Sequence, residues 1–130
     1  MDAWLNSVLA RIANGTLLPA AYYNRLDCDA ALAVRDSEEA FDAAWTRQFE
    51  QVENLWATAD VPAAARSLAE DIRRESFLAV SSATGQHEIA SYVSDDFDMI
   101  VRGRLVGAQD GFIKDLWDVY ERGEFPVPPR

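Results

Sequence analysis

Two residue types that often carry chemistry are almost missing from this chain of 130 residues. It contains one cysteine, Cys28, and one histidine, His87. A single cysteine excludes an intramolecular disulfide, and two such ligands are too few for a typical zinc site. Cys28 lies between Asp27 and Asp29, whose charges raise the pKa of a thiol and so disfavour a cysteine nucleophile. We therefore expect no metal and no cofactor.

Basic residues are also scarce. The 12 lysines and arginines face 22 acidic residues, for a formal charge of −10, and Lys114 is the single lysine. Nucleic acids and anionic membranes are poor partners for such a chain, because binding phosphate needs clustered cations. A basic protein is the natural complement. Two other readings stay open: acidity that serves solubility, and acidity that reflects a saline source.

Long apolar runs are absent, since no segment approaches the ~20 residues needed to span a bilayer. Residues 1–6 lack the basic and apolar regions of a signal peptide, so a cytoplasmic location is expected. Apolar residues are nevertheless plentiful, at 49% of the chain. At this length they can form the core of one domain without disulfides or metals.

Apolar residues recur every three or four positions through most of the chain, which is typical of amphipathic helices. In residues 41–56 this stripe is aromatic, and no alternation with period two indicates strands. The pattern predicts an all-α domain over residues 1–123, an antiparallel bundle of five to six helices. Residues 124–130 contain three prolines and are expected to form an extended tail that either docks or stays free.

Capping residues suggest where these helices begin and end. Asp36 with Glu39 matches a capping box at the start of the aromatic helix, and residues 81–85 read as a turn. The next helix is expected from about His87 to Leu105. The residues expected in the core are Trp45, Phe49, Trp56, Leu68, Ile72, Ile89, Val93, Phe97, Ile100, Leu116 and Trp117.

Two motifs suggest known functions but depart from them. Residues 86–94 resemble a helix-turn-helix, yet the acids that follow would face DNA phosphates. Glu50 and Glu53 form a Glu-x-x-Glu pair like that of magnesium-dependent nucleotide pyrophosphohydrolases of the MazG type. In those enzymes a Glu-x-x-Asp pair follows on a later helix, whereas here the pair, Glu39 and Asp42, comes first.

The acids after residue 87 are the best candidate site in the sequence. Glu88, Asp95 and Asp98 recur at helical spacing on a face expected to point outward, and Asp96 borders them. A negative face of this kind attracts basic partners. The alternative is a solvated helix surface in which Asp98 pairs with Arg102.

These observations rank three hypotheses about function. The first is a small acidic protein-binding module of the immunity or antitoxin kind, which neutralises a basic partner such as a nuclease. The second is a magnesium-dependent, all-α nucleotide pyrophosphohydrolase, although the absence of a complete motif favours a protein that is not an enzyme. The third is a structural or regulatory homodimer joined through an aromatic helix face.

Overall fold

A computed structural model describes residues 2–128 of the chain. Within this range it contains seven α-helices and no strand. These helices are α1 (Asp2–Ala13), α2 (Ala20–Arg25), α3 (Cys28–Ser37), α4 (Glu39–Thr58), α5 (Ala63–Thr84), α6 (His87–Leu105) and α7 (Phe112–Glu121). None of the helices in the described range is long and apolar enough to cross a membrane. The all-α prediction is therefore confirmed, with more helices than expected.

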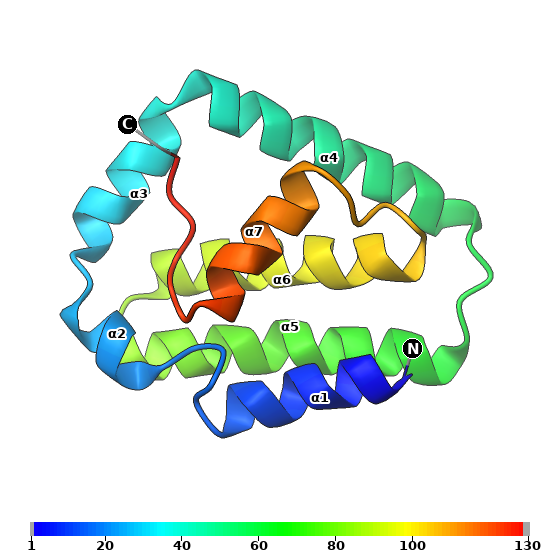
Figure 1. Ribbon diagram of the computed structural model, residues 1–130, viewed down its shortest axis with the longest axis horizontal. Helices are drawn as coiled ribbons and strands as arrows, with labels where there is room; N and C mark the ends of the chain where they lie inside the picture. The colour runs from blue at the N-terminus through cyan, green and yellow to red at the C-terminus, as the bar shows by residue number, and fades with distance from the viewer. Residues whose placement is uncertain (1, 129–130) are drawn as a thin grey trace.

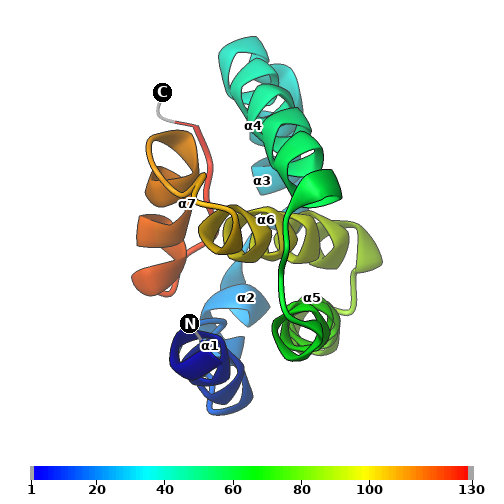
Figure 2. The same ribbon diagram turned by 90° about the vertical axis from the view of Figure 1, so that its right-hand side faces the viewer.

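Helix α6 lies at the centre of the molecule. It packs along α5 and also contacts α4 and α7, while α1 and α2 pack on α5 (Figure 1, Figure 2). Twelve of its 19 residues are buried, more than in any other helix. Four polar residues of α6 (Ser94, Asp96, Asp98 and Arg102) are therefore enclosed along with its apolar ones, which decides where the candidate site lies.

The directions of the helices differ in one respect from a simple antiparallel bundle. Helices α5 and α6 run in opposite directions, but α1 runs the same way as α5 (Figure 1). Short loops force consecutive helices to pack antiparallel. Because α2, α3 and α4 lie between α1 and α5 in the chain, no short loop sets the relative direction of this pair.

The predicted bounds of one helix are confirmed, and two other helix ends carry local capping signals. Helix α6 spans the predicted residues 87–105, and Gly85 ends α5 in the left-handed conformation with φ of 69°. The side chain of Asp27 caps α3 by accepting a hydrogen bond from the backbone N–H of Ala30, at 3.1 Å. These are local signals, since each depends on residues within one helical turn.

Two other boundaries were wrong. Asp36 does not cap the aromatic helix, because it lies inside α3 and its carboxylate accepts a hydrogen bond from the hydroxyl of Tyr92. Glu38 occupies the N-cap of α4 without a side-chain hydrogen bond. Residues 81–84 are not a turn but the last turn of α5. This turn stays helical because Val80 and Ala83 pack against the core.

The core largely matches the prediction. Six of the eleven expected residues are buried: Ile72, Ile89, Val93, Phe97, Ile100 and Leu116. Four more are partly buried and pack against them: Trp45, Phe49, Leu68 and Trp117. The aromatic stripe of α4 is less enclosed than expected, since Val52 is the one fully buried residue of that helix. Partly exposed aromatic rings on α4 are thus available at the surface.

The C-terminal segment returns to the helices. Residues 124–128 have no helical structure, and Phe125 is buried at 2% exposure. Its backbone N–H donates a hydrogen bond of 3.0 Å to the hydroxyl of Tyr22, while Val127 stays exposed. Residues 129 and 130 of the expected tail lie outside the described range. Of the two outcomes left open for the tail, docking through Phe125 is the one observed.

Gly103 allows α6 to approach its neighbours closely. A Cβ atom at this position would lie 2.9 Å from the carbonyl oxygen of Ala108 and 3.1 Å from Cδ1 of Ile113. We expect Gly103→Ala to lower the free energy of unfolding by about 1–3 kcal/mol through overpacking, although alanine favours helix by about 1 kcal/mol. Urea unfolding measures the change, and Ala57→Gly at an exposed position of α4 measures helix propensity alone. A stabilised Gly103→Ala variant would contradict the close packing.

Candidate functional site

Asp96 lies at the centre of a buried hydrogen-bond network. Its side chain is fully buried and accepts two hydrogen bonds from the guanidinium of Arg35, at 2.7 and 3.1 Å. It also accepts one from Nε1 of Trp45, at 2.8 Å, and one from the hydroxyl of Tyr120, at 2.6 Å. Four donors on one carboxylate satisfy it fully. The network joins α3, α4 and α7 to α6.

Arg35 is enclosed by aromatic rings as well as by Asp96. Its guanidinium carbon lies 4.9 Å from the ring centre of Phe41, 5.3 Å from that of Tyr92 and 5.1 Å from that of Phe125. Burial by itself would lower the pKa of Arg35, but the charge and hydrogen bonds of Asp96 raise it. Arg35 therefore stays charged at ordinary pH.

The position of Asp96 corrects its predicted place beside an exposed acidic face. Asp96 follows Val93 by three residues and precedes Ile100 by four, so it shares the buried face of α6. That spacing was visible in the sequence. Its partner was not, because Arg35 lies 61 residues away.

A second charged cluster pairs two of the other predicted acids on α6, Asp98 and Asp95, with arginines. Asp98 is buried at 8% exposure and accepts hydrogen bonds from Arg73 at 3.2 Å and from Arg102 at 3.0 Å. Arg73 also contacts Asp95 at 2.9 Å, and Arg102 contacts Glu53 at 2.6 Å. A chain of ion pairs thus links α4 to α6 and α6 to α5, in the order Glu53, Arg102, Asp98 and Arg73. Asp98 is an internal ion-pair partner, which corrects its predicted exposure.

Asp95 and Glu88 remain accessible. Asp95 is half-exposed, and burial raises the pKa of its carboxyl group, with Arg73 opposing that shift. Glu88 is exposed and forms no ion pair with another residue in the range 2–128. Of the four predicted binding residues, these two are therefore the ones at the surface.

Unpaired acidic residues gather instead where α3 meets α4. We call this group the acidic corner, defined by Asp36, Glu38, Glu39 and Asp42. All four are exposed, and none forms an ion pair within the described part of the chain. The basic residue next to them, Arg35, is already paired with Asp96. Sequence reasoning missed this group because Asp36 and Glu39 were interpreted as a capping box.

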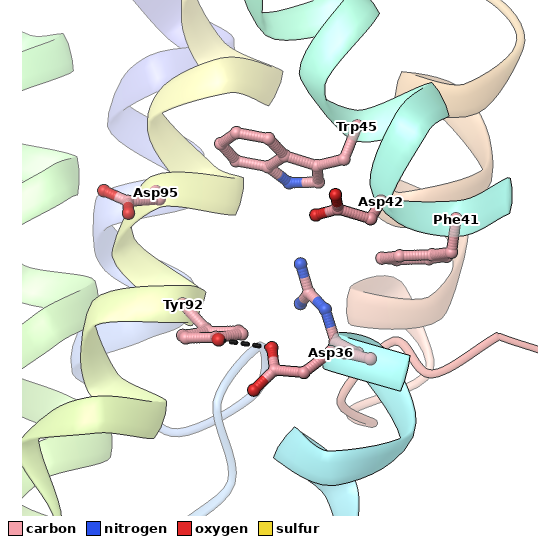
Figure 3. Close-up of a pocket in the computed structure, with 7 residues that line it drawn as sticks. Asp36, Phe41, Asp42, Trp45, Tyr92 and Asp95 are labelled. Carbon is pink, nitrogen blue, oxygen red and sulfur yellow. Dashed lines mark hydrogen bonds between the residues drawn. The ribbon is translucent and has the colours of Figure 1, made fainter. Parts of the chain in front are cut away.

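The acidic corner borders a cavity of about 200 Å³ between α3, α4 and α6. In Figure 3, Phe41, Asp42 and Trp45 of α4 face Tyr92 of α6 across this space, and Asp36 approaches Tyr92 from α3. Asp95 points away from them. The cavity is lined by Arg35, Asp36, Phe41, Asp42, Trp45, Tyr92 and Asp95. It therefore combines aromatic walls with carboxylates at one entrance.

The hydrogen bond between Tyr92 and Asp36 predicts an unusual titration. Together with burial and the charge of Asp36, it raises the pKa of Tyr92 to about 12. The protonated phenol is the bonded form, so its contribution to stability is complete below pH ~10 and is lost as pH rises toward about 12. Ultraviolet titration should show a tyrosine ionising near pH 12 that disappears in Tyr92→Phe. In Asp36→Asn this transition should move down, and an unchanged midpoint would contradict the role of Asp36.

The other residues considered for catalysis or metal binding do not come together in one site. Burial and then Asp29 and Asp27 raise the pKa of Cys28, whose thiol donates to the carbonyl of Leu26 at 3.6 Å. His87 instead pairs through Nδ1 with the hydroxyl of Ser81, at 2.9 Å. Within residues 2–128, no three metal-binding side chains come together. The structure thus provides no geometric support for the pyrophosphohydrolase hypothesis.

Comparison with known proteins adds an independent observation. No curated protein matches the chain. A family model described as Immunity protein PIM1 matches residues 7–127, from the middle of α1 to the docked C-terminal segment. The match includes every residue of the acidic corner and of the cavity, and it covers most of the chain. The chain therefore belongs to the immunity protein PIM1 family.

Proposed function

We propose that this protein neutralises a basic toxin protein by binding it at the acidic corner. Membership of an immunity protein family supports a protein partner. The observation that carries the choice of surface is the group of four exposed carboxylates that have no counter-ion within residues 2–128. In contrast, the acids of α6 near Asp98 are already paired with arginines.

The aromatic residues next to these carboxylates suit a binding surface. Phe41 and Trp45 are only partly buried and lie between the acidic corner and α6 (Figure 3). Aromatic side chains supply much of the energy at protein interfaces, and surrounding charges set the specificity and the rate of association. The same proposal places Glu88 and Asp95 at the edge of the interface.

The buried pair of Arg35 and Asp96 gives this surface a fixed geometry. It holds the end of α3 and the start of α4 against α6, so the acidic corner is positioned before any partner arrives. A preorganised surface binds more tightly because less freedom is lost on association. Asp96 thus supports the interface from beneath.

Co-expression tests the proposal. The probe is a toxic open reading frame encoded directly beside the gene for this chain, expressed with and without it. We expect the chain to restore growth and to form a stoichiometric complex with the toxin on size exclusion with light scattering. Asp36→Lys with Asp42→Lys should abolish protection, whereas Asp60→Lys with Asp115→Lys, an equal change at exposed acids elsewhere, should preserve it. The proposal would be overturned if both double variants lost protection equally. It would also be overturned if neither the unchanged chain nor the Asp60→Lys with Asp115→Lys variant protected the cells.

A further inference from the structure

The size of the cavity beside the acidic corner restricts what can enter it. Its volume of about 200 Å³ lies below the ~300–1,000 Å³ of cavities that hold drug-sized ligands. A nucleotide or cofactor is therefore too large to be enclosed. A single side chain from a bound protein is an occupant of suitable size.

The charge of the cavity selects a cation. Arg35 at its base is neutralised by two hydrogen bonds to Asp96. Asp42 lies at the entrance with no ion pair and no hydrogen bond to another described side chain. Among the side chains in residues 2–128, Asp36 accepts a hydrogen bond only from the hydroxyl of Tyr92, so it keeps further lone pairs. The excess charge at this entrance is therefore negative.

The shape of the lining favours a planar cation. Phe41, Trp45 and Tyr92 form aromatic walls, of which Phe41 and Tyr92 also contact Arg35, and carboxylates come from both α3 and α4 (Figure 3). A guanidinium group can stack on aromatic rings while its several N–H groups bond carboxylates, whereas a lysine ammonium is a compact point charge. One arginine of the chain already does both: Arg102 lies over Trp56 at 5.6 Å and contacts the carboxylates of Glu53 and Asp98.

We propose that this cavity receives the guanidinium group of one arginine of the partner protein, held by Asp42 and Asp36 between the aromatic walls. The inference rests on the proposed function and specifies how the partner is recognised. The arginine would be an anchor residue near the centre of the interface, where buried aromatic and arginine contacts concentrate binding energy.

The indole N–H of Trp45 reports on the cavity. It donates to Asp96 at 2.8 Å, at the base of the site, so its NMR signal should move when a cation enters. The probe is N-acetyl-arginine amide, titrated into the ¹⁵N-labelled full chain, with Trp45→Phe assigning the signal. The matching lysine amide and the uncharged citrulline amide are compared with it. The signals of Trp4 and Trp56, which already lie under Arg104 and Arg66, serve as internal references.

We expect saturable movement of the Trp45 signal with arginine amide, at least about threefold weaker binding of lysine amide, and no binding of citrulline amide. Asp36→Asn with Asp42→Asn should remove the response, and Asp60→Asn with Asp115→Asn should keep it. The titration extends to about 50 mM, which fills most of a site with a dissociation constant of ~10 mM. No movement by then, or equal movement with citrulline amide, would overturn the inference. The proposed function would still stand if toxin binding depended on the acidic corner, so the two failures are distinguishable.

Discussion

Replacing Asp96 by asparagine is expected to lower the free energy of unfolding by about 3–5 kcal/mol. The change leaves the guanidinium of Arg35, which is 6% exposed, without a counter-charge inside the protein. Breaking a buried ion pair by removing one partner has an effect of this size, because the remaining charge cannot regain its hydration. The amide also offers fewer acceptor sites to Trp45 and Tyr120, which both bond the carboxylate.

The neighbouring residue provides the matched control. Asp95→Asn is the same chemical change one position earlier, but it breaks a contact with Arg73 in which both side chains are about half exposed. Surface ion pairs contribute about 0–1 kcal/mol. Urea unfolding followed by circular dichroism should show a much lower midpoint for Asp96→Asn at an unchanged slope. Midpoints within error of each other would show that the Asp96 network does not stabilise the fold.

A double-mutant cycle separates the pair from its surroundings. Arg35→Met should also destabilise the protein strongly, since it leaves the carboxylate of Asp96 buried with only neutral donors. Arg35→Met combined with Asp96→Asn should destabilise less than the sum of the two changes, with a coupling energy of about 0.5–3 kcal/mol. Additive effects would mean that the two residues act independently.

The helices were largely predictable from the sequence because their signals are local. Helix α6 has its apolar stripe within a few residues and a glycine on either side, so its bounds followed from spacing alone. The start of α4 did not follow from the sequence, because the carboxylate of Asp36 could either cap α4 or accept a hydrogen bond from a distant residue. The hydroxyl of Tyr92, 56 residues away, determined that it became part of α3 instead of a cap.

Which acidic residues stay unpaired was less predictable than the helices, because ion pairs form between residues that are far apart in the sequence. Spacing indicates which face of a helix an acid occupies, but not which base another helix brings to it. Arg73 lies 25 residues from Asp98 and neutralises it from α5. The acidic corner keeps its charge because its sequence neighbour Arg35 turns inward to Asp96. The candidate site is therefore defined by which acids the fold leaves unpaired.

The rate at which the toxin associates should depend strongly on the acidic corner. The acidic corner has four exposed carboxylates with no ion pair to another described residue, in a chain with net charge −10. Such a group attracts a basic protein over a distance that salt shortens. Changing all four to their amides, in Asp36→Asn, Glu38→Gln, Glu39→Gln and Asp42→Asn, should lower the association rate by about 10- to 100-fold at low salt. Stopped-flow fluorescence or surface plasmon resonance measures this rate between low and physiological ionic strength.

A second set of four exposed acids makes the test specific to this surface. Asp60→Asn, Glu70→Gln, Asp110→Asn and Asp115→Asn change the net charge by the same amount at positions outside the acidic corner. If total charge alone governs association, both quadruple variants will slow it equally, and the corner is not the binding surface. If the corner steers the encounter, only its own variant will lose most of the salt dependence, because local charge near the contact dominates the rate.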